Sequence, residues 1–172
     1  MSTTPLREGV IQIKRLPDGS YRLHTETVIP YSLDEMFAFF AEPENLEALT
    51  PPWLNFEIIT PAPIEMREGT LIDYRLKLHG IPINWRTEIS DWEPPYRFVD
   101  CQLKGPYRLW RHEHTFTECE AGTRVTDEVH YAVWGGALVN RLFVQKDVTR
   151  IFRYRCEQLR AFKPVSEERT AR

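Results

Sequence analysis

The residues most able to do chemistry stand at alternate positions of one short stretch, Trp110 to Phe116. His112 and His114 lie between these two aromatic residues, and a strand turns alternate side chains to the same face. If that face points inward, both imidazoles reach an apolar interior and could hydrogen-bond a carbonyl or carboxylate group of a ligand. One of them could instead act as a general acid or base.

Two other interpretations of the histidines stay open. The pair could bind a metal ion with an oxygen from Asp127 or Glu128, although no third ligand at a fixed spacing is evident. The histidines could equally be core or rim residues with satisfied ring nitrogens. We therefore keep His112 and His114 as candidate catalytic residues, and we predict no metal ion and no cofactor.

Asp127 is a second candidate polar residue of the interior, because it shares a face with Val125 and Val129 in the following predicted strand. A buried carboxylate needs a partner, or its pKa rises. Arg153 and Arg155 of the C-terminal segment are the natural partners. The simplest outcome is a structural ion pair where helix and sheet meet, which by itself says little about function.

Aromatic residues make up 12% of the chain, and several fall on the inward faces of predicted strands. They could line a ligand cavity or simply fill the core. The candidate ligand-binding residues are Tyr74, Trp85, Trp110, His112, His114, Phe116, Tyr131 and Phe152. The sequence contains no Gly-rich phosphate loop, no HExxH and no GxSxG, and no cysteine has the local signature of a nucleophile.

The elements before these residues begin with an alternating strand over 21–29. Ser32 and Glu35 then have the spacing of a capping box, which predicts a short helix running to about Ala41. A second short helix is predicted over 44–49. Two helices of this size do not make a helical domain, so the fold depends on the remainder of the chain.

Residues 56–133 form a run of alternating segments separated by tight turns, which is typical of an antiparallel meander. Residues 138–162 contain neither Pro nor Gly and carry apolar residues at helical spacing, so a long amphipathic helix is expected there. Two-layer packing requires this helix to cover the apolar face of the sheet.

Four segments carry a family resemblance: HTETVIPYSLDEMFAFFAEPENLEALTPPWLNFEI, WRTEISDWEPPYRFVDCQLKGPYRLWRHEHTFTE, GTRVTDEVHYAVWGGALVNRLF and FRYRCEQL. They resemble the SRPBCC superfamily, which includes START, birch-allergen-like and polyketide-cyclase-like domains, and in particular bacterial members of unassigned function. The resemblance spans about Tyr21 to Phe162. It implies an α+β helix-grip fold, with about six to seven antiparallel strands wrapped around the C-terminal helix. Members of the superfamily mostly bind hydrophobic ligands, and its few enzymes share no common catalytic motif.

We accordingly expect a helix-grip domain over 21–163, an arm or extra hairpin strand in 1–20 and a polar tail over 164–172. The expected function is non-catalytic binding of a small hydrophobic or lipid-like molecule in a cavity between sheet and helix. The alternatives are a cyclase or dehydratase-type enzyme that uses His112 and His114, and a protein-interaction module. The oligomeric state stays open between monomer and homodimer.

Charge and composition limit which partners the protein can bind and where in the cell it is expected. The net charge of −3 and the mixed signs along the strands argue against a nucleic-acid surface. The N-terminus has no signal-peptide pattern, and no apolar run approaches the ~18–20 residues that span a bilayer. The three cysteines form no CxxC and no disulfide framework, so a cytoplasmic protein is expected.

Overall fold

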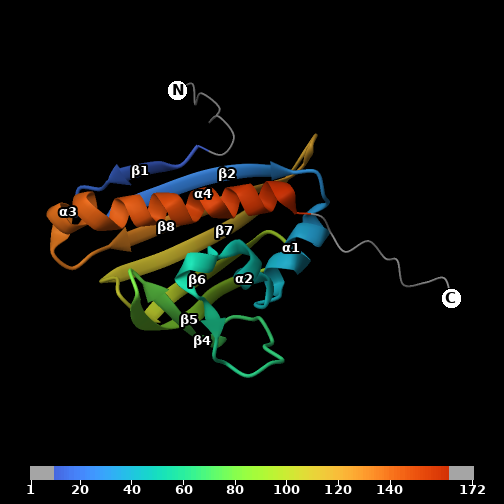
Figure 1. The fold of residues 1–172 in the computed structure, drawn as a ribbon. Helices are drawn as coiled ribbons and strands as arrows, with labels where there is room; N and C mark the ends of the chain where they lie inside the picture. The colour runs from blue at the N-terminus through green and yellow to red at the C-terminus, as the bar shows by residue number, and fades with distance from the viewer. Residues whose placement is uncertain (1–9, 163–172) are drawn as a thin grey trace.

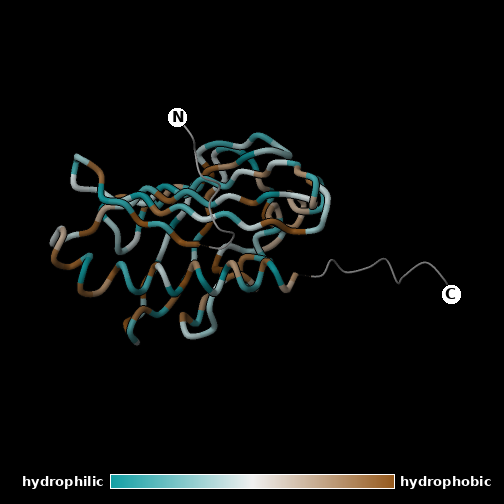
Figure 2. Tube along the Cα trace, turned by 90° about the horizontal axis from the view of Figure 1, so that it is seen from above, coloured by the Kyte–Doolittle hydropathy of each residue, from teal (hydrophilic) through white to brown (hydrophobic). Residues whose placement is uncertain are grey.

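Alternation along the strands sets the two faces of the sheet. In β2 (Tyr21–Ile29) every second side chain is buried, and β8 (Gly122–Ala132) follows the same rule. The two strands pair antiparallel along nine residues of each, from Tyr21 opposite Tyr131 to Ile29 opposite Thr123. Figure 2 shows the resulting alternation of hydrophilic and hydrophobic residues along the strands and the helix. One face of the sheet is therefore free to pack against a second layer.

The structure is a computed structural model that describes residues 10–162. Eight antiparallel strands form one sheet in the order β1-β2-β8-β7-β6-β5-β4-β3 (Figure 1). The remaining strands are β1 (Gln12–Arg15), β3 (Glu57–Ile58), β4 (Leu71–Leu78), β5 (Ile81–Glu93), β6 (Arg97–Lys104) and β7 (Leu109–Cys119). The described part of the N-terminal arm pairs with β2 as a hairpin strand. The tail expected over 164–172 lies outside the described residues.

The helices are α1 (Leu33–Ala41), α2 (Asn45–Leu49), the 3-10 helix η1 (Pro52–Leu54), α3 (Gly136–Val139), the π-helical η2 (Asn140–Val144) and α4 (Gln145–Ala161). The predicted long helix thus begins in α3 and passes through a π-helical turn before α4. Figure 1 shows α4 lying along the sheet, with α1 beside its C-terminal end. A curved sheet that holds one long helix in this way is the helix-grip fold, as predicted.

The predicted capping box starts α1. The Ser32 hydroxyl accepts a hydrogen bond from the Glu35 amide at 3.3 Å, and the Glu35 carboxylate accepts one from the Ser32 amide at 2.8 Å. These two bonds satisfy amides that the first helical turn leaves without partners. The helix therefore begins at a fixed point after β2 and buries Phe37 and Phe40 against the sheet.

The interior contains two apolar clusters. In one, Phe37 and Phe40 of α1 pack against Phe98 and Phe116. In the other, Tyr21, Val129, Tyr131 and Phe152 come together, with Trp110 packed against them. Strand β7 passes through both clusters, with Trp110 near one and Phe116 in the other. His112 and His114 lie between them, so the middle of the inner face of the sheet is polar.

Glycine is required at the turn between β7 and β8. Gly122 has a φ of +124°, and a Cβ atom there would lie 2.2 Å from the carbonyl oxygen of Ile29 and 2.8 Å from Cα of Pro30. Contacts below 3.0 Å to backbone atoms cannot be relieved by moving a side chain. This close approach is what lets the end of β2 lie tightly against β8.

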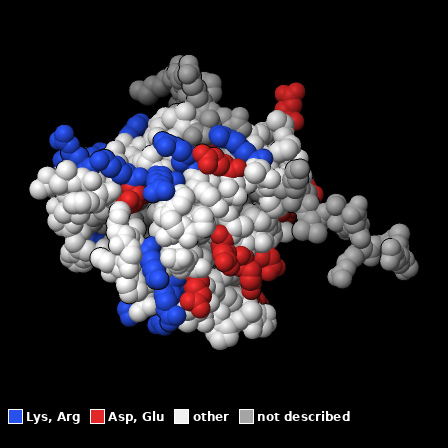
Figure 3. Space-filling view, in the orientation of Figure 1, with Lys and Arg blue, Asp and Glu red and all other residues white. Residues whose placement is uncertain are grey.

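The outer surface carries both signs of charge. Figure 3 shows Lys and Arg together with Asp and Glu on the face seen in Figure 1, with uncharged areas between them. Among residues 10–162, no helix is both long enough and apolar enough to cross a membrane.

Candidate functional site

A cavity of about 200 Å³ lies between the sheet and the helices. Its wall combines apolar residues of β4 and β5, such as Ile72, Leu76 and Ile89, with Val148 and Phe152 of α4. Side chains of α1, α2 and the segment after them also line it, and the cavity is partly open to the outside. The space between sheet and helix is therefore not filled by side chains, which is the condition for an internal ligand site in this fold.

Five polar side chains form one connected group at this cavity, which we call the polar cluster: Asp100, His112, His114, Asp127 and Arg155. Asp100 comes from β6, the histidines from β7, Asp127 from β8 and Arg155 from α4. Asp100 lies directly opposite His112 in the sheet, and His114 directly opposite Asp127. The register of three neighbouring strands thus brings the cluster together. All its members except Asp127 line the cavity.

Both histidines bind the same oxygen of Asp127. His112 Nε2 and His114 Nδ1 each lie 2.9 Å from Asp127 Oδ1. The carboxylate of Asp127 is 2% exposed and acts only as an acceptor when ionised, so His112 Nε2 donates to it, while His114 Nδ1 forms an ion pair with the same oxygen. This assignment of protons follows from the hydrogen-bond network. It leaves His112 Nδ1 and His114 Nε2 on the opposite side of the two rings.

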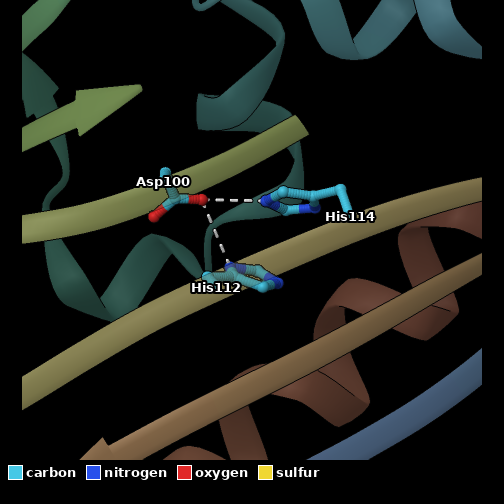
Figure 4. Close-up of side chains that lie close together, drawn as sticks. All are labelled: Asp100, His112 and His114. Atoms are coloured by element: carbon cyan, nitrogen blue, oxygen red, sulfur yellow. Dashed lines mark hydrogen bonds and ion pairs between the residues drawn. The ribbon is translucent and has the colours of Figure 1, made fainter. Parts of the chain in front are cut away.

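Those two nitrogens face Asp100. His114 Nε2 lies 2.9 Å from Asp100 Oδ2, and His112 Nδ1 lies 3.6 Å from the same oxygen (Figure 4). The imidazole rings lie over one another with centroids 3.8 Å apart, and Phe98 stacks on His114 at 4.2 Å. The aromatic contacts fix the planes of the rings, so the two nitrogens keep pointing toward Asp100.

Arg155 supplies the positive charge that Asp127 needs. Its Nε donates to Asp127 Oδ2 at 3.1 Å, which confirms the predicted ion pair between helix and sheet. Arg153, the other predicted partner, is exposed. Arg155 Nη2 also lies 3.3 Å from His114 Nδ1. Arg155 donates to this nitrogen in the tautomer of His114 that leaves Nδ1 without a proton.

The cluster shifts the pKa values of its members in different directions. Burial lowers the pKa of His112, and the neighbouring His114 lowers it further, so this imidazole is neutral. Burial also opposes the charging of His114, but its hydrogen bonds to Asp100 and Asp127 outweigh that effect and raise its pKa. His114 is therefore the ring that binds a second proton more readily, and that proton lies between His114 and Asp100.

The two carboxylates stay ionised. Burial would raise the pKa of Asp127, but Arg155 and the hydrogen bonds from the histidines hold that pKa well below its usual range. Burial also works against ionisation of Asp100, and the two histidines lower its pKa nonetheless. When His114 is protonated, the two negative carboxylates balance its charge and that of Arg155. The buried cluster is electrically neutral as long as His112 is neutral.

Six of the eight residues predicted to bind ligand line the cavity. These are Tyr74, Trp85, Trp110, His112, His114 and Phe152. The rings of Trp85 and Trp110 meet edge to face at 5.6 Å, and Trp85 Nε1 donates to Thr87 Oγ1 at 2.9 Å. The face chosen for these side chains from the alternation of residues thus points into the cavity.

Phe116 and Tyr131 were wrongly placed at the cavity wall and are a correction to the prediction. Both point inward, but neither is among the lining residues. Phe116 packs edge to face on Phe37 of α1 at 5.5 Å. Tyr131 stacks on Tyr21 at 5.4 Å. Helix α1 covers one end of the inner face and the second apolar cluster fills the other, so these two residues belong to the packed core.

Asp100 is the site residue that the sequence reasoning missed. A signal was present, because Asp100 alternates with Phe98, which is buried. The carboxylates that we predicted to supply an oxygen ligand beside the histidines were instead Asp127 and Glu128. In the structure Asp127 holds the far side of the rings, and Glu128 lies on the other face of β8. Asp100 Oδ2, His112 Nδ1 and His114 Nε2 are the three atoms that could ligate a metal ion, and they lie within 4.8 Å of one another.

Comparison with known protein families assigns the chain to one of them. Residues 29–153, well over half of the 172, match the family described as polyketide cyclase / dehydrase and lipid transport. The chain belongs to this family, and with it to the SRPBCC superfamily. The family combines ligand-binding and cyclase or dehydrase-type proteins, so membership does not choose between the two. No curated protein matches the chain.

Solved structures agree on the fold. Protein Ms6760 from Mycobacterium smegmatis is 19% identical with a TM-score of 0.62, over 88% of this chain and 96% of that one. Protein CV1439 from Chromobacterium violaceum is 11% identical with a TM-score of 0.66, over 82% and 96%. Ara h 8.0201 is 13% identical with a TM-score of 0.57, over 81% and 97%. At these identities the likeness shows a common fold and nothing about ligand or activity.

Proposed function

We propose that this protein binds a small, mainly apolar molecule in the cavity between the sheet and α4, without transforming it. The observation that carries the proposal is the cavity itself, about 200 Å³ of space bounded largely by aliphatic and aromatic side chains. Burial of apolar surface contributes about 25 cal/mol per Å² before the cost of ordering the ligand, so burial supplies the main driving force for binding here.

The volume limits the size of the ligand. An apolar cavity of about 150 Å³ holds one benzene molecule. A cavity of about 200 Å³ therefore suits a single substituted ring or a short branched chain. A long acyl chain would require α1, α2 or the segment after them to move outward. We expect ligands with one ring to bind more tightly than fatty acids.

The polar cluster should contact the polar end of the ligand, and its charges limit which chemical group that end can carry. Asp100 is its most accessible member, with 19% of the side chain exposed, and its contacts to the histidines both involve Oδ2. A carboxylate accepts hydrogen bonds and repels anions. The polar end of the ligand should therefore be a donor, such as a phenol or an alcohol, and a free carboxylate should be rejected.

The experiment compares matched ligands and matched variants. Thermal shift and native mass spectrometry are carried out with phenols, the corresponding benzoates and fatty acids. Leu76→Trp adds bulk at the cavity wall, whereas Lys77→Trp adds the same ring on the outer face of the same strand. A phenol at about 100 times its dissociation constant should stabilise the wild-type protein by about 2.7 kcal/mol.

The variants then locate the binding. Leu76→Trp should abolish the thermal shift, and Lys77→Trp should retain it. If Leu76→Trp binds as well as the wild-type protein does, the ligand lies elsewhere and the proposal is wrong. If phenols and benzoates stabilise the protein equally, Asp100 does not contact the polar end of the ligand, although the cavity can still be the binding site.

A second candidate function is an enzyme of the cyclase or dehydratase type. The polar cluster favours it, because His112 and Asp100 stand together on the cavity wall, within reach of a bound molecule. Dehydration of a β-hydroxy ketone can be followed by the rise in enone absorbance. Turnover that Lys77→Trp retains and His112→Ala loses would establish this function. If the wild-type protein binds such ketones but does not convert them, the enzyme function is wrong and the binding function remains.

A further inference from the structure

We propose that Asp100, His112 and His114 form a binding site for one divalent transition-metal ion, with its open side toward the cavity. This goes beyond the binding of an apolar ligand and does not depend on it. The three residues come from adjacent strands β6 and β7, and Figure 4 shows their side chains converging on a common point.

The spacing of the ligand atoms suits such an ion. Bonds of about 2.0–2.2 Å to a tetrahedral zinc ion put neighbouring ligand atoms about 3.3–3.6 Å apart. Asp100 Oδ2 lies 3.6 Å from His112 Nδ1 and 2.9 Å from His114 Nε2, and all three atoms lie within 4.8 Å of one another. To reach these distances, Asp100 Oδ2 and His114 Nε2 must separate by a few tenths of an ångström, whereas Asp100 Oδ2 and His112 Nδ1 already have the spacing of two ligands.

In each ring, the nitrogen turned away from Asp100 already has a carboxylate partner, as the second nitrogen of a metal-bound histidine commonly does. Such histidines commonly donate their second N–H to a carboxylate, which fixes the ring and its tautomer. Here His112 Nε2 donates to Asp127 Oδ1, and His114 Nδ1 pairs with the same oxygen, at 2.9 Å each. Arg155 in turn binds the other oxygen of Asp127 at 3.1 Å. The two nitrogens that face Asp100 are the ones that could bind an ion, His114 Nε2 after it loses the proton that it shares with Asp100.

One of these nitrogens has no hydrogen bond within residues 10–162. His112 is 7% exposed, its Nε2 proton is used by Asp127, and its Nδ1 faces the carboxylate of Asp100 at 3.6 Å. A lone pair and a carboxylate that face one another repel, and a cation between them removes the repulsion. An ion pair between helix and sheet needs only Asp127 and Arg155, so it does not account for this arrangement.

The donor set indicates the class of ion. Two imidazoles and one carboxylate suit Zn²⁺, Co²⁺ or Fe²⁺, whereas Mg²⁺ and Ca²⁺ prefer oxygen ligands throughout. Three protein ligands leave at least one position open, as in catalytic zinc sites. Because all three residues line the cavity, a molecule in the cavity could occupy that position. The ion would take the place of the proton now shared by Asp100 and His114.

The test uses the full chain after removal of metals with a chelator and without any organic ligand. Isothermal titration with ZnCl₂ should show one Zn²⁺ bound per chain, and CoCl₂ should produce visible absorption bands from a nitrogen- and oxygen-ligated ion. Asp100→Asn, which keeps the shape of the side chain, and His112→Ala should each weaken Zn²⁺ binding more than about tenfold. Both should lose the cobalt bands.

His24→Ala is the matched control. His24 is half-buried on the other face of the sheet, 3.5 Å from Glu26 and 3.7 Å from Glu128, so it is a histidine beside two carboxylates outside the proposed site. This variant should bind Zn²⁺ like the wild-type protein. Absence of stoichiometric binding, or loss of binding in His24→Ala with retention in a correctly folded Asp100→Asn, would overturn the proposal. Neither outcome bears on ligand binding by the metal-free protein, which the phenol experiment measures separately.

Discussion

Replacing Arg155 by methionine is expected to destabilise the fold strongly, because it removes the countercharge from a buried carboxylate. Asp127 is 2% exposed, and its Oδ2 accepts from Arg155 Nε at 3.1 Å. Methionine has a similar length, so packing against Phe40 is largely kept while the charge is lost. Removing one partner of a buried ion pair costs about 3–5 kcal/mol. For a domain of this size that corresponds to a fall in Tm of about 6–20 °C.

Arg86→Met is the matched control for this prediction. Arg86 also binds an aspartate, Asp73, through two bonds of 2.8 Å, but both side chains are close to half exposed. Exposed pairs contribute little, so this variant should melt close to the wild-type temperature. Urea unfolding of the chelator-treated proteins, followed by circular dichroism, provides the free energies. If Arg155→Met loses no more stability than Arg86→Met does, Asp127 does not depend on that countercharge, and the description of the cluster is wrong.

Two further stability predictions concern packing. Leu159→Ala should cost about 2–5 kcal/mol in urea unfolding because Leu159 is fully buried between α4 and the sheet, whereas Leu142→Ala, at a half-exposed position of η2, should stay within about 0.5 kcal/mol; equal losses would mean that α4 is not packed as described. Gly122→Ala should lower Tm far more than Gly80→Ala, since both glycines have positive φ but only Gly122 is pressed against backbone atoms. Equal melting temperatures for the two glycine variants would show that the turn can open without cost.

The fold could be predicted from the sequence because its signals are local. Alternation over 21–29 matches the observed β2, and Ser32 with Glu35 starts the predicted helix. The alternation around His112 also put both histidines on one face of their strand, although it left open whether that face points inward. Each of these inferences uses residues only a few positions apart, where backbone geometry alone decides which side chains share a face.

The site was predicted less well because it depends on how separate elements meet. Alternation shows that Phe116 and Tyr131 point inward, but it does not show which inward residues border empty space. That depends on α1, which covers Phe116, and on Tyr21, which covers Tyr131. Asp100 was missed for a related reason. Its position opposite His112 depends on the register between β6 and β7, and the turn connecting these strands does not reveal that register in the sequence.

The cluster owes its existence to strand alignment, and this makes it easy to gain or lose in evolution. Asp100 and His112, like His114 and Asp127, are directly opposed pairs on neighbouring strands. A shift of β7 by one residue in its pairing with β6 and β8 would turn both imidazoles to the outer face and separate them from Asp100 and Asp127. Relatives could therefore keep the same cavity and the same helix while differing in whether any polar group reaches the ligand.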